Sequence, residues 1–389
     1  MALSGAEGER IALGRSLLER TYLTPDWMPA FVAVPRSAFL PDRVWPYDMA
    51  TGGTVAVDRR DEPELWAAYA DADVPIVTQW DDGAGDSRGR VPTSSASMPS
   101  VVFRMLAALD VRAGHRVLEI GTGTGWNAAL LALRLGVDNV TSVEIDPDVA
   151  DAARGRLAAG ELLCTVLTRD GAEGDETGAP YDRIIATAGV RHIPPAWLRD
   201  SAPGGRIVAP WGTHFSNEDA LVRLDLAEDQ ASASGGFLGP VEFMKLRSQR
   251  SPFAGHQAYV PDGVSGADRS TTTVTEEQLL GGGRFAVTRF AVGLRVRDCH
   301  HQAAAGRDGA RPVWFYGLTD RSWACVMFRE GRAEARVWQS GPRRLWDEVS
   351  AALAWWRAAG EPGYERFGLT VTAHGQYAWL DHPAEAWDL

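Results

Sequence analysis

The sequence predicts an α/β protein with a doubly wound, mostly parallel sheet at its centre, an N-terminal helical and loop extension, and a C-terminal α+β domain. Three observations predict this class. Short apolar runs alternate with helical stretches from Val101 to Gly212, and a glycine-rich turn joins one of these strands directly to a helix. Residues 284–389 combine alternating apolar and polar runs with one amphipathic helix, as expected of an antiparallel sheet with a helix packed on it.

Length and composition limit the class of protein further. At ~150 residues per domain, a chain of 389 residues has two or three domains. The formal net charge of −12 disfavours binding to a phosphate backbone, so we expect no nucleic-acid partner. No apolar run approaches the ~20 residues of a membrane-spanning helix, and the N-terminus lacks the basic-then-apolar order of a secretion signal. We therefore expect a cytoplasmic protein without membrane association, whose oligomeric state the sequence leaves open.

The region before the central sheet is expected to be rich in helices and loops. Residues 6–20 place Ile11 and Leu17 near one face of a helix, and proline-punctuated, aromatic-rich sequence follows as far as Pro46. Residues 81–100 are rich in Asp, Gly, Ser and Pro and are predicted to form a long loop. Because loops of this length inside a domain are commonly functional, we expect a lid or active-site segment there.

The central region has the pattern of a parallel sheet with helices on both faces. Its strands are continuous apolar runs, as expected when both faces of a sheet are covered. The expected strands are Arg116–Ile120, Val140–Ile145, Leu162–Leu167, Arg183–Thr187, Arg206–Ala209 and Leu221–Leu226, and the expected helices are Trp126–Leu135, Pro147–Ala159 and Pro194–Leu198.

The C-terminal region is predicted to be a separate antiparallel sheet with one helix. Residues 250–283, rich in Ser, Gly, Thr and Asp, have the composition of a linker, and residues 284–297 alternate in two phases, which predicts a bulged strand. We place the boundaries at 1–92 for the extension, 93–248 for the central domain, 249–283 for the linker and 284–389 for the accessory domain. The remaining expected elements are the strands Val313–Tyr316, Trp323–Phe328, Arg332–Trp338, Phe367–Thr372 and Gln376–Leu380 and a helix opened by Pro342.

Three cysteines, Cys164, Cys299 and Cys325, are too few and too scattered for a disulfide framework. His300 and His301 follow Cys299, but neighbouring residues of a strand point to opposite faces. No second ligand pair lies at the spacing of a zinc site. We therefore expect these residues to be structural and the protein to hold no metal.

The stretch from Arg116 to Trp126 carries the most informative motif. An apolar strand ends in Glu119-x-Gly121-x-Gly123-x-Gly125, and a helix follows at once. Glycines permit a sharp turn and a close approach of a ligand to the backbone, while the helix N-terminus offers free N–H groups. The dinucleotide fingerprint would be G-x-G-x-x-G. The strand–turn–helix context nevertheless favours a ligand site in this turn.

Acidic residues also end the next two strands. Glu144 lies 19 residues beyond Gly125 and can accept hydrogen bonds from both hydroxyls of a ribose, as the ribose-binding acid of dinucleotide folds does. Asp146 is the rival candidate for this role. The third strand is followed by Asp170 and Gly171. Because ligands of open α/β sheets bind at the carboxyl ends of the strands, these acids predict a nucleoside site.

The motifs resemble the protein-L-isoaspartate O-methyltransferase family over about half of the chain. The glycine-rich motif alone is typical of any S-adenosylmethionine-dependent methyltransferase with a Rossmann-like sheet. Val34-Pro-Arg, Ser97-Met-Pro99 and Ile184-Ile-Ala-Thr-Ala188 narrow the resemblance to this family. The matching stretches are Val34–Pro41, Ser97–Pro99, Val117–Gly125, Ser142–Glu144, Asp170–Gly171, Tyr181–Ala188, Ile193–Pro194 and Pro203–Gly212.

The resemblance implies S-adenosylmethionine as the cofactor. The glycine-rich turn would hold its methionine part, Glu144 its ribose, and Asp170 would border its adenine. Ser97 would lie beside the substrate carboxylate and the methyl donor, although a helix cap is the alternative role for this serine. The predicted cofactor-binding residues are Glu119, Gly121, Thr122, Gly123, Gly125, Glu144, Ile145, Asp170, Gly171 and Thr187, and the predicted catalytic residues are Ser97, Ser95 and Thr93.

The implied reaction needs little chemical equipment from the protein. An aspartyl carboxyl with a reference pKa of ~3.9 is already ionised at pH 7 and needs no general base. The site must align the carboxylate with the methyl donor and exclude water. A hydroxyl such as that of Ser97 can orient the carboxylate without protonating it. His115 and His192, the histidines nearest to the motifs, are interpreted as structural or peripheral.

Three departures from the repair enzymes of this family bear on the substrate. The segment Thr93–Ser97 is richer in hydroxyls and follows the acidic run Asp81–Asp86, Trp126 stands where a tyrosine is usual, and a C-terminal domain follows that a minimal repair enzyme does not need. This long form resembles the actinobacterial branch associated with maturation of ribosomal peptides, in graspetide and lanthipeptide pathways. There, methylation of an aspartate leads to a succinimide or to isoaspartate.

We therefore expect an enzyme that methylates an aspartate carboxylate in a modified, cyclised ribosomal precursor peptide. The C-terminal domain would recognise that peptide through some of its eight tryptophans, or would be a scaffold whose tryptophans form its core. Two alternatives remain: a repair methyltransferase for isoaspartyl residues in damaged proteins, and a cofactor-binding protein without catalysis.

Overall fold

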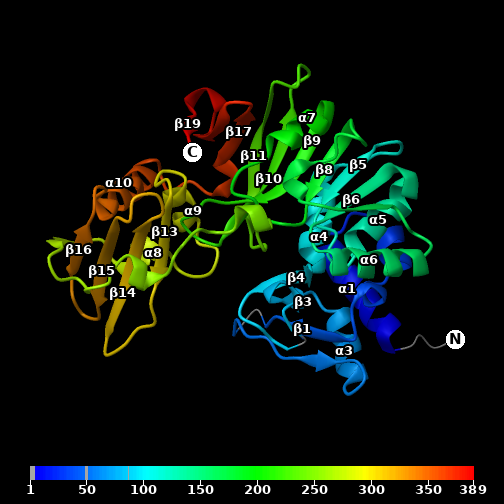
Figure 1. Cartoon of the computed structure of the whole chain (residues 1–389), viewed down its shortest axis with the longest axis horizontal. Helices are drawn as coiled ribbons and strands as arrows, with labels where there is room; N and C mark the ends of the chain where they lie inside the picture. Colours follow the sequence, from blue (N-terminus) through cyan, green and yellow to red (C-terminus); the bar gives the residue numbers. More distant parts are fainter. Residues whose placement is uncertain (1–4, 49–50, 86) are drawn as a thin grey trace. The chain divides into compact units, whose positions relative to one another are not determined.

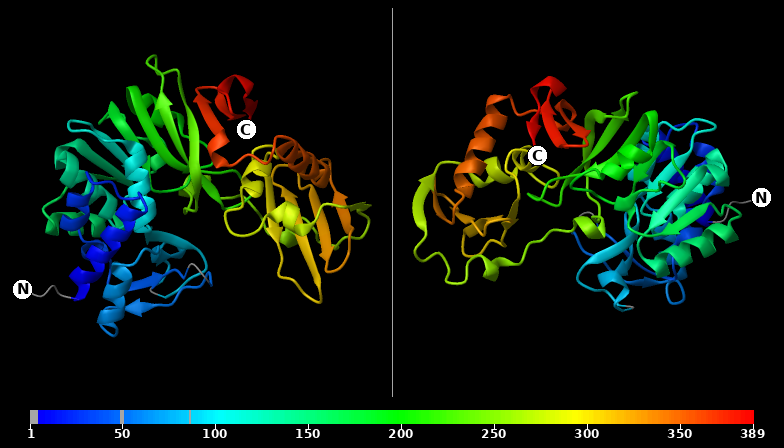
Figure 2. Two further views of the ribbon diagram at one scale, coloured as in Figure 1. Left: turned by 180° about the vertical axis from the view of Figure 1, so that it is seen from behind. Right: turned by 45° about the horizontal axis from the view of Figure 1, so that its top comes forward.

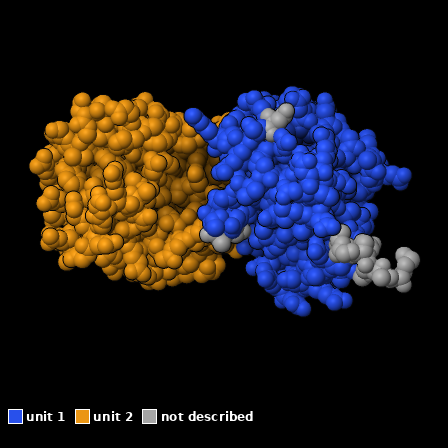
Figure 3. Space-filling model, turned by 90° about the horizontal axis from the view of Figure 1, so that it is seen from below, with its two compact units in different colours: residues 1–188, 194–209, 223–233 blue, residues 189–193, 210–222, 234–389 orange. Residues whose placement is uncertain are grey.

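The computed structural model describes residues 5–48, 51–85 and 87–389, so Asp86 of the acidic run and residues 1–4 lie outside the described part. The chain forms two compact units (Figure 3). Unit 1 comprises Met1–Ala188, Pro194–Ala209 and Arg223–Ala233, and unit 2 comprises Gly189–Ile193, Pro210–Val222 and Ser234–Leu389.

Unit 1 contains the predicted doubly wound domain (Figure 1). Its strands are hydrogen-bonded in the order β9-β8-β5-β6-β7, and each neighbouring pair is parallel. Leu118, Ile120 and Ile184 are fully buried, which explains the continuous apolar runs of these strands. The bounds are β5 Val117–Ile120, β6 Val140–Glu144, β7 Thr165–Thr168, β8 Tyr181–Ala186 and β9 Ser201–Trp211, with helices α4 Pro99–Leu109, α5 Trp126–Leu135, α6 Pro147–Ala159 and α7 Pro195–Asp200.

The N-terminal part of unit 1 adds a small antiparallel sheet in the order β2-β1-β3-β4. The expected helix over residues 6–20 is confirmed as α1, whereas the expected loop over residues 81–100 is wrong at Pro92–Ala96. That segment is strand β4. Its backbone groups form hydrogen bonds with β3, and its polar sequence lacks the apolar alternation that would predict a strand. The bounds are α1 Gly5–Glu19, α2 Met28–Ala33, β1 Arg43–Pro46, β2 Val57–Asp58, α3 Pro63–Ala70, β3 Ile76–Trp80 and β4 Pro92–Ala96.

Strands β10 (Asp219–Leu226) and β11 (Ser232–Val241) contribute residues to both units. Within unit 2, β11 is followed in hydrogen-bonding order by β17 (Phe367–Thr372), β18 (Gly375–Leu380) and β19 (Trp387–Asp388). The last predicted hairpin therefore belongs with β11, and its assignment to the separate C-terminal sheet is wrong.

Unit 2 also contains the predicted antiparallel sheet, in the order β12-β16-β15-β14-β13. Helix α10 packs against β14, β15 and β16 of this sheet (Figure 2). Its buried Leu345, Val349 and Leu353 form the apolar stripe expected from the sequence. The bounds are β12 Asp268–Thr272, β13 Cys299–Ala303, β14 Ala310–Gly317, β15 Trp323–Arg329, β16 Ala335–Ser340 and α10 Leu345–Ala358.

Two segments before this sheet differ from the sequence-based expectation. The predicted strand over residues 284–297 is wrong, because Val287–Gly293 is helix α9, whose buried Phe290 and Ala291 precede buried Leu294 at helical spacing. The segment predicted to be a linker, residues 249–283, contains β12 and helix α8 (Glu276–Leu280). Strand β12 pairs with β16 along five residues, so this segment completes an edge of the sheet.

Among the described residues, no helix combines the length and apolarity needed to cross a bilayer. Cys299 is fully buried on β13, and the Nδ1 atom of His301 lies 2.6 Å from the carbonyl oxygen of Phe215. The described part of the chain contains no group of three or more His, Cys, Asp or Glu residues that could hold a metal ion.

Candidate functional site

The glycine-rich turn closes the carboxyl end of β5. Gly121, Gly123 and Gly125 have φ angles of +97°, +54° and +91°, which side chains other than hydrogen rarely allow. A Cβ on Gly121 would lie 2.9 Å from Oγ1 of Thr187, and one on Gly125 would contact Ala153 of α6. The turn therefore needs glycine both for its backbone conformation and for its packing. It leads directly into α5, whose first N–H groups have no side-chain cap.

Glu119 lies beneath this turn and is completely buried. Its Oε1 accepts a hydrogen bond from Nδ2 of Asn127 at 2.7 Å, and its Oε2 accepts one from Oγ of Ser142 at 2.5 Å. Oγ1 of Thr122 lies 2.6 Å from the same Ser142 hydroxyl. Burial raises the pKa of Glu119 to about 7, although both hydrogen bonds oppose that shift. Glu119 is thus linked to Thr122 of the turn through the hydroxyl of Ser142.

Glu144, at the end of β6, faces the turn. Its Oε2 accepts a hydrogen bond from the amide of Gly123 at 2.9 Å, and its Oε1 accepts one from the amide of Asp146 at 3.1 Å. Burial raises the pKa of Glu144, and the backbone donors lower it. The rival acid Asp146 instead caps α6, because its Oδ1 accepts from the amides of Asp148 and Val149. Of the two candidates, Glu144 is the one that touches the turn.

The ends of β7 and β8 border the same turn. Asp170 is half-buried and accepts a hydrogen bond from the amide of Ala172 at 2.9 Å. A Cβ on Gly171 would lie 2.4 Å from Cγ2 of Ile120, so only glycine fits there. Oγ1 of Thr187 donates to the carbonyl oxygen of Gly121 at 2.5 Å. Ile145, directly after Glu144, is half-buried and offers an apolar side chain at this edge.

Strand β4 lies against the turn and brings the predicted catalytic segment to it. The carbonyl oxygen of Ser95 is 3.5 Å from the position of a Cβ on Gly123, and Oγ of Ser94 is 4.0 Å from it. The sequence did not single out Ser94, which is buried and accepts a hydrogen bond from Thr78. The fold therefore brings the hydroxyl residues of β4 close to the glycine-rich turn, although the two segments are more than twenty positions apart in the sequence.

The three predicted catalytic hydroxyls have different surroundings. Oγ1 of Thr93 donates to Oε1 of Gln79 at 2.8 Å and accepts from the amide of Asp82 at 3.1 Å. The hydroxyls of Ser95 and Ser97 form no hydrogen bond within the part of the chain that the structure describes. Both serines are half-buried, so their hydroxyls are available to a ligand.

Ser97 does not cap the helix that follows it. The N-cap residue of α4 is Met98, and no side chain forms a cap hydrogen bond at that position. The amide of Ser100 is bound instead by Oδ1 of Asp73, at 2.9 Å. The capping role that competed with a site role for Ser97 is therefore wrong.

Arg36 holds the backbone beside Ser97. From the sequence it was noted only as part of the Val34-Pro-Arg motif. Its guanidinium is buried and donates to the carbonyl oxygens of Ala96 at 2.8 Å, Val74 at 2.9 Å and Ala72 at 3.2 Å. Burial lowers the pKa of Arg36 to about 9. The sequence contains one sign of this role: an arginine within the mostly apolar segment Phe31–Leu40 is expected to be buried and paired.

Trp126 anchors the same motif from the other side. Its Nε1 donates to the carbonyl oxygen of Val34 at 3.0 Å, and the guanidinium of Arg36 lies 5.8 Å from the ring centroid. The ring is buried against Phe103 in an edge-to-face contact. This departure from the usual tyrosine is therefore a packing feature.

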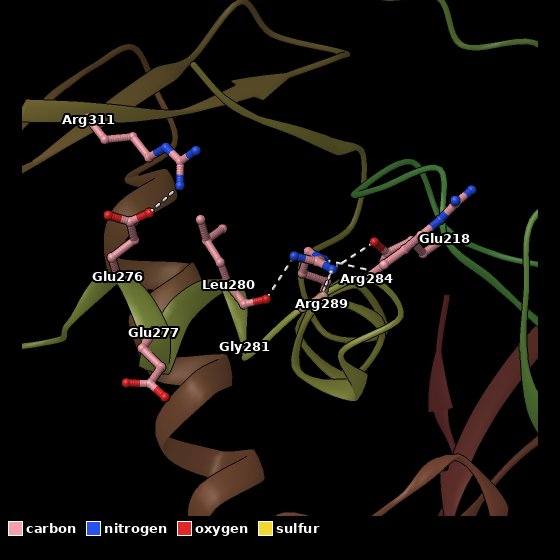
Figure 4. A pocket seen from close by; sticks show the side chains of 9 residues that line it. Glu218, Glu276, Glu277, Leu280, Gly281, Arg284, Arg289 and Arg311 are labelled. Atoms are coloured by element: carbon pink, nitrogen blue, oxygen red, sulfur yellow. Dashed lines mark hydrogen bonds and ion pairs between the residues drawn. The ribbon is translucent and has the colours of Figure 1, made fainter. Parts of the chain in front are cut away.

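A separate pocket of about 650 Å³ lies within unit 2 (Figure 4). Arg289 donates to both carboxylate oxygens of Glu218, Arg311 pairs with Glu276, and Arg284 pairs with Glu242. Each arginine of this pocket thus already has a carboxylate partner. None of the predicted site residues is among its lining residues, which are Glu218, Glu276, Glu277, Leu280, Gly281, Gly283, Arg284, Arg289 and Arg311.

The parallel sheet, the glycine-rich turn and the acid at the end of β6 define a Rossmann-like S-adenosylmethionine-dependent methyltransferase. The chain matches the family described as Protein-L-isoaspartate(D-aspartate) O-methyltransferase (PCMT) over residues 56–251. It belongs to this family of carboxyl O-methyltransferases, and S-adenosylmethionine, the cofactor expected from the sequence, is the cofactor of the family.

Individual relatives agree with this assignment. The chain is 36% identical over 196 residues to the protein-L-isoaspartate O-methyltransferase of Methanopyrus kandleri, covering 50% of this chain and 72% of that protein. It is 42% identical over 183 residues to the enzyme of the same name from Methanoculleus marisnigri, covering 47% and 74%. A solved structure of a protein-L-isoaspartate O-methyltransferase matches 96% of this chain and 100% of its own with a TM-score of 0.54; at 20% identity this likeness concerns the fold alone.

Proposed function

We propose that this protein transfers a methyl group from S-adenosylmethionine to the carboxylate of an isoaspartyl residue in a peptide or protein. The observation that best supports this proposal is the contact between β4 and the glycine-rich turn, where the Ser95 carbonyl oxygen lies 3.5 Å from the position of a Cβ on Gly123. It supports a site in which substrate-side hydroxyls and cofactor-side backbone meet. The names of the relatives favour isoaspartate as the substrate.

The proposed cofactor site uses the residues around the turn. The backbone of Gly121, Thr122, Gly123 and Gly125 would approach the methionine part, and the cradle left by the missing side chains supports this fit. The Glu144 carboxylate would accept hydrogen bonds from the ribose hydroxyls. Ile145, Asp170, Gly171 and Thr187 would border the remainder, while Glu119 would hold the turn from beneath.

The chemistry places modest demands on these residues. The cofactor supplies a methyl group bound to a positively charged sulfur. One oxygen of the ionised substrate carboxylate forms the new bond to that methyl carbon, and the carbon–sulfur bond breaks with its electron pair left on sulfur. No proton moves, so no general base is required. The free hydroxyls of Ser97 and Ser95 would orient the carboxylate by hydrogen bonds, and Arg36 would fix the backbone that carries them.

Two substrate peptides test this proposal. Methyl transfer from labelled S-adenosylmethionine is measured with a short peptide containing isoaspartate and with the same peptide containing aspartate. We expect transfer to the isoaspartyl peptide and not to its aspartyl twin. Binding of S-adenosylhomocysteine in the same samples shows whether the nucleoside site is intact. Tight binding without transfer to either peptide would contradict the isoaspartyl substrate.

The second candidate substrate is an aspartate in a modified ribosomal peptide. The observation that favours it is strand β4 of the β3–β4 hairpin, which carries the hydroxyl residues Thr93, Ser94 and Ser95 in succession. Five tryptophans of unit 2 are also half-buried and able to contact a peptide; these are Trp314, Trp338, Trp355, Trp379 and Trp387. The C-terminal region does not by itself favour this substrate, because the solved isoaspartate methyltransferase structure matches 96% of the chain.

A further inference from the structure

A chain of hydrogen bonds joins the β3–β4 hairpin to the acid at the end of β6. Thr93 donates to Oε1 of Gln79 at 2.8 Å, and Nε2 of Gln79 donates to Oδ2 of Asp146 at 3.2 Å. The amide of Asp146 in turn donates to Glu144 at 3.1 Å, and Glu144 accepts from the amide of Gly123 at 2.9 Å. Gln79 connects the hairpin to the parallel sheet, because it accepts a hydrogen bond from Thr93 of the hairpin and donates one to Asp146, which follows β6.

The β3–β4 hairpin is irregular at Gln79. The register of β3 with β4 shifts on both sides of Gln79, between Val77 and Gln79 and between Gln79 and Trp80. Such a bulge re-aims a side chain that would otherwise follow the regular alternation. Directly after it, Asp81 and Asp82 have φ angles of +47° and +55°, which cost energy in residues other than glycine.

The strained turn is held by the same network. The amide of Asp82 donates to Oγ1 of Thr93 at 3.1 Å, and the Asp81 carboxylate accepts from the amides of Arg90 and Val91 at 2.9 and 2.7 Å. The hydrogen bonds to these backbone amides lower the pKa of Asp81. The bulge and the two left-handed residues thus lie at and directly after Gln79, whose side chain reaches Asp146.

We propose that Gln79 is a positioning residue that couples occupation of the nucleoside site at Glu144 to the order of the strand carrying Ser95 and Ser97. This inference rests on the proposed function, since it takes the site at Glu144 as that of the cofactor. A ligand that binds Glu144 fixes the carboxylate to which the Asp146 amide is bonded. Gln79 transmits that restraint to Thr93 and to β4, so that the substrate-side hydroxyls become ordered when the cofactor is present.

Hydrogen exchange of the backbone amides tests this coupling with S-adenosylhomocysteine as the probe. In the wild-type protein, the probe should slow exchange in residues 92–97 by roughly 5-fold or more, the lower end of couplings between sites. Gln79→Met, which has similar length and neither polar group, should bind the probe but lose this slowing. Gln79→Glu keeps the acceptor for Thr93 but presents a like charge to Asp146, so it should keep the hairpin ordered without the probe and lose the response to it.

Thr78→Val is the matched control, because Thr78 lies on the same strand and bonds to Ser94 but has no bond to Asp146. It should respond to the probe as the wild type does, and thermal unfolding verifies that all variants fold. An unchanged response in Gln79→Met, or no response in the wild type despite binding, would overturn the coupling. Absence of probe binding to the wild type would instead refute the proposed function.

Discussion

The amide of Gly123 donates a hydrogen bond to the carboxylate of Glu144 over 2.9 Å, so the end of the second strand of the parallel sheet is bound to the glycine turn of the first. Two oxygens of one side chain thus organise the turn on one side and the start of α6 on the other. Because the acid already accepts backbone donors, its orientation is set before a ligand arrives. Pre-orientation of this kind lowers the entropic cost of binding.

Glu144→Ala is expected to weaken binding of S-adenosylhomocysteine by about 10- to 100-fold, because hydrogen bonds to a charged group contribute about 1.5–3 kcal/mol. Isothermal titration calorimetry measures the change. Asp146→Ala is the matched comparison: it removes a helix cap worth about 1 kcal/mol, so it should lower the melting temperature and reduce affinity less. A greater loss of affinity in Asp146→Ala than in Glu144→Ala would indicate that Asp146 binds the ribose, and would contradict the role proposed for Glu144.

Ser97→Ala is expected to lower the rate of methyl transfer by about 10-fold, the effect of losing roughly one hydrogen bond to a charged carboxylate. Its melting temperature and its affinity for S-adenosylhomocysteine should match the wild type, since the hydroxyl has no partner in the described part of the chain. Thr93→Val should lower the melting temperature, because the Thr93 hydroxyl bonds to Gln79 and to the amide of Asp82 and supports the hairpin. A drop in the melting temperature of Ser97→Ala would show that its role is structural.

Glu119→Gln is expected to change how stability depends on pH. Burial raises the pKa of Glu119 from its ordinary 4.5 to about 7, so the folded protein holds a proton there that the unfolded chain has already lost. Stability contributed by this group therefore declines as the pH rises from about 4.5 to about 7. The glutamine variant lacks that decline and should gain stability relative to the wild type across this range. Urea unfolding at several pH values measures the difference, and a difference that is constant with pH would contradict the raised pKa.

Lys245→Met is expected to destabilise unit 2. Lys245, the only lysine among 39 lysine and arginine residues, donates to Asp219 at 2.5 Å, and both side chains are almost fully buried. Removing the lysine leaves the buried Asp219 carboxylate without its ion-pair partner, at a cost of about 3–5 kcal/mol. A Cβ on Gly189 would lie 3.0 Å from the ammonium nitrogen, so space around the pair is limited.

Thermal unfolding tests the pair through a double variant. Lys245→Met combined with Asp219→Asn should recover part of the lost melting temperature, because position 219 then no longer carries a buried negative charge without its lysine partner. Arg307→Met is the control, since Arg307 pairs with Asp308 at a site where both side chains are almost fully exposed. Equal losses in the single and double Lys245 variants would show that packing, not charge, is responsible.

Strand β5 was predictable because all four of its residues are buried. Strands β6 and β8 each have buried residues at neighbouring positions, which face opposite sides of the sheet. Strand β4 was missed for the converse reason. Pro92–Ala96 carries hydroxyl side chains with no apolar alternation, and it becomes a strand through its pairing with β3. Helix α9 was mistaken for a strand because its short apolar pattern fits both periods, and length alone separates the two.

The acids of the site were predictable as a group but not individually. Glu144 and Asp146 lie two residues apart, and the sequence does not separate a ribose-binding acid from a helix cap. The structure gives Asp146 the cap and turns Glu144 toward Gly123. Ser97 was undecided in the same way, and the binding of Ser100 by Asp73 removed its capping role.

The sequence by itself determined the parallel sheet, the glycine turn and the family, because these follow from local periodicity and from motifs of adjacent residues. Only the tertiary structure decided that β4 lies against the turn and that Gln79 bonds to Asp146 at a separation of 67 positions. It also decided that Arg36 binds the carbonyl oxygen beside Ser97. Polar contacts between distant segments depend on where the folded backbone places their donors and acceptors, and no local pattern in the chain encodes those distances.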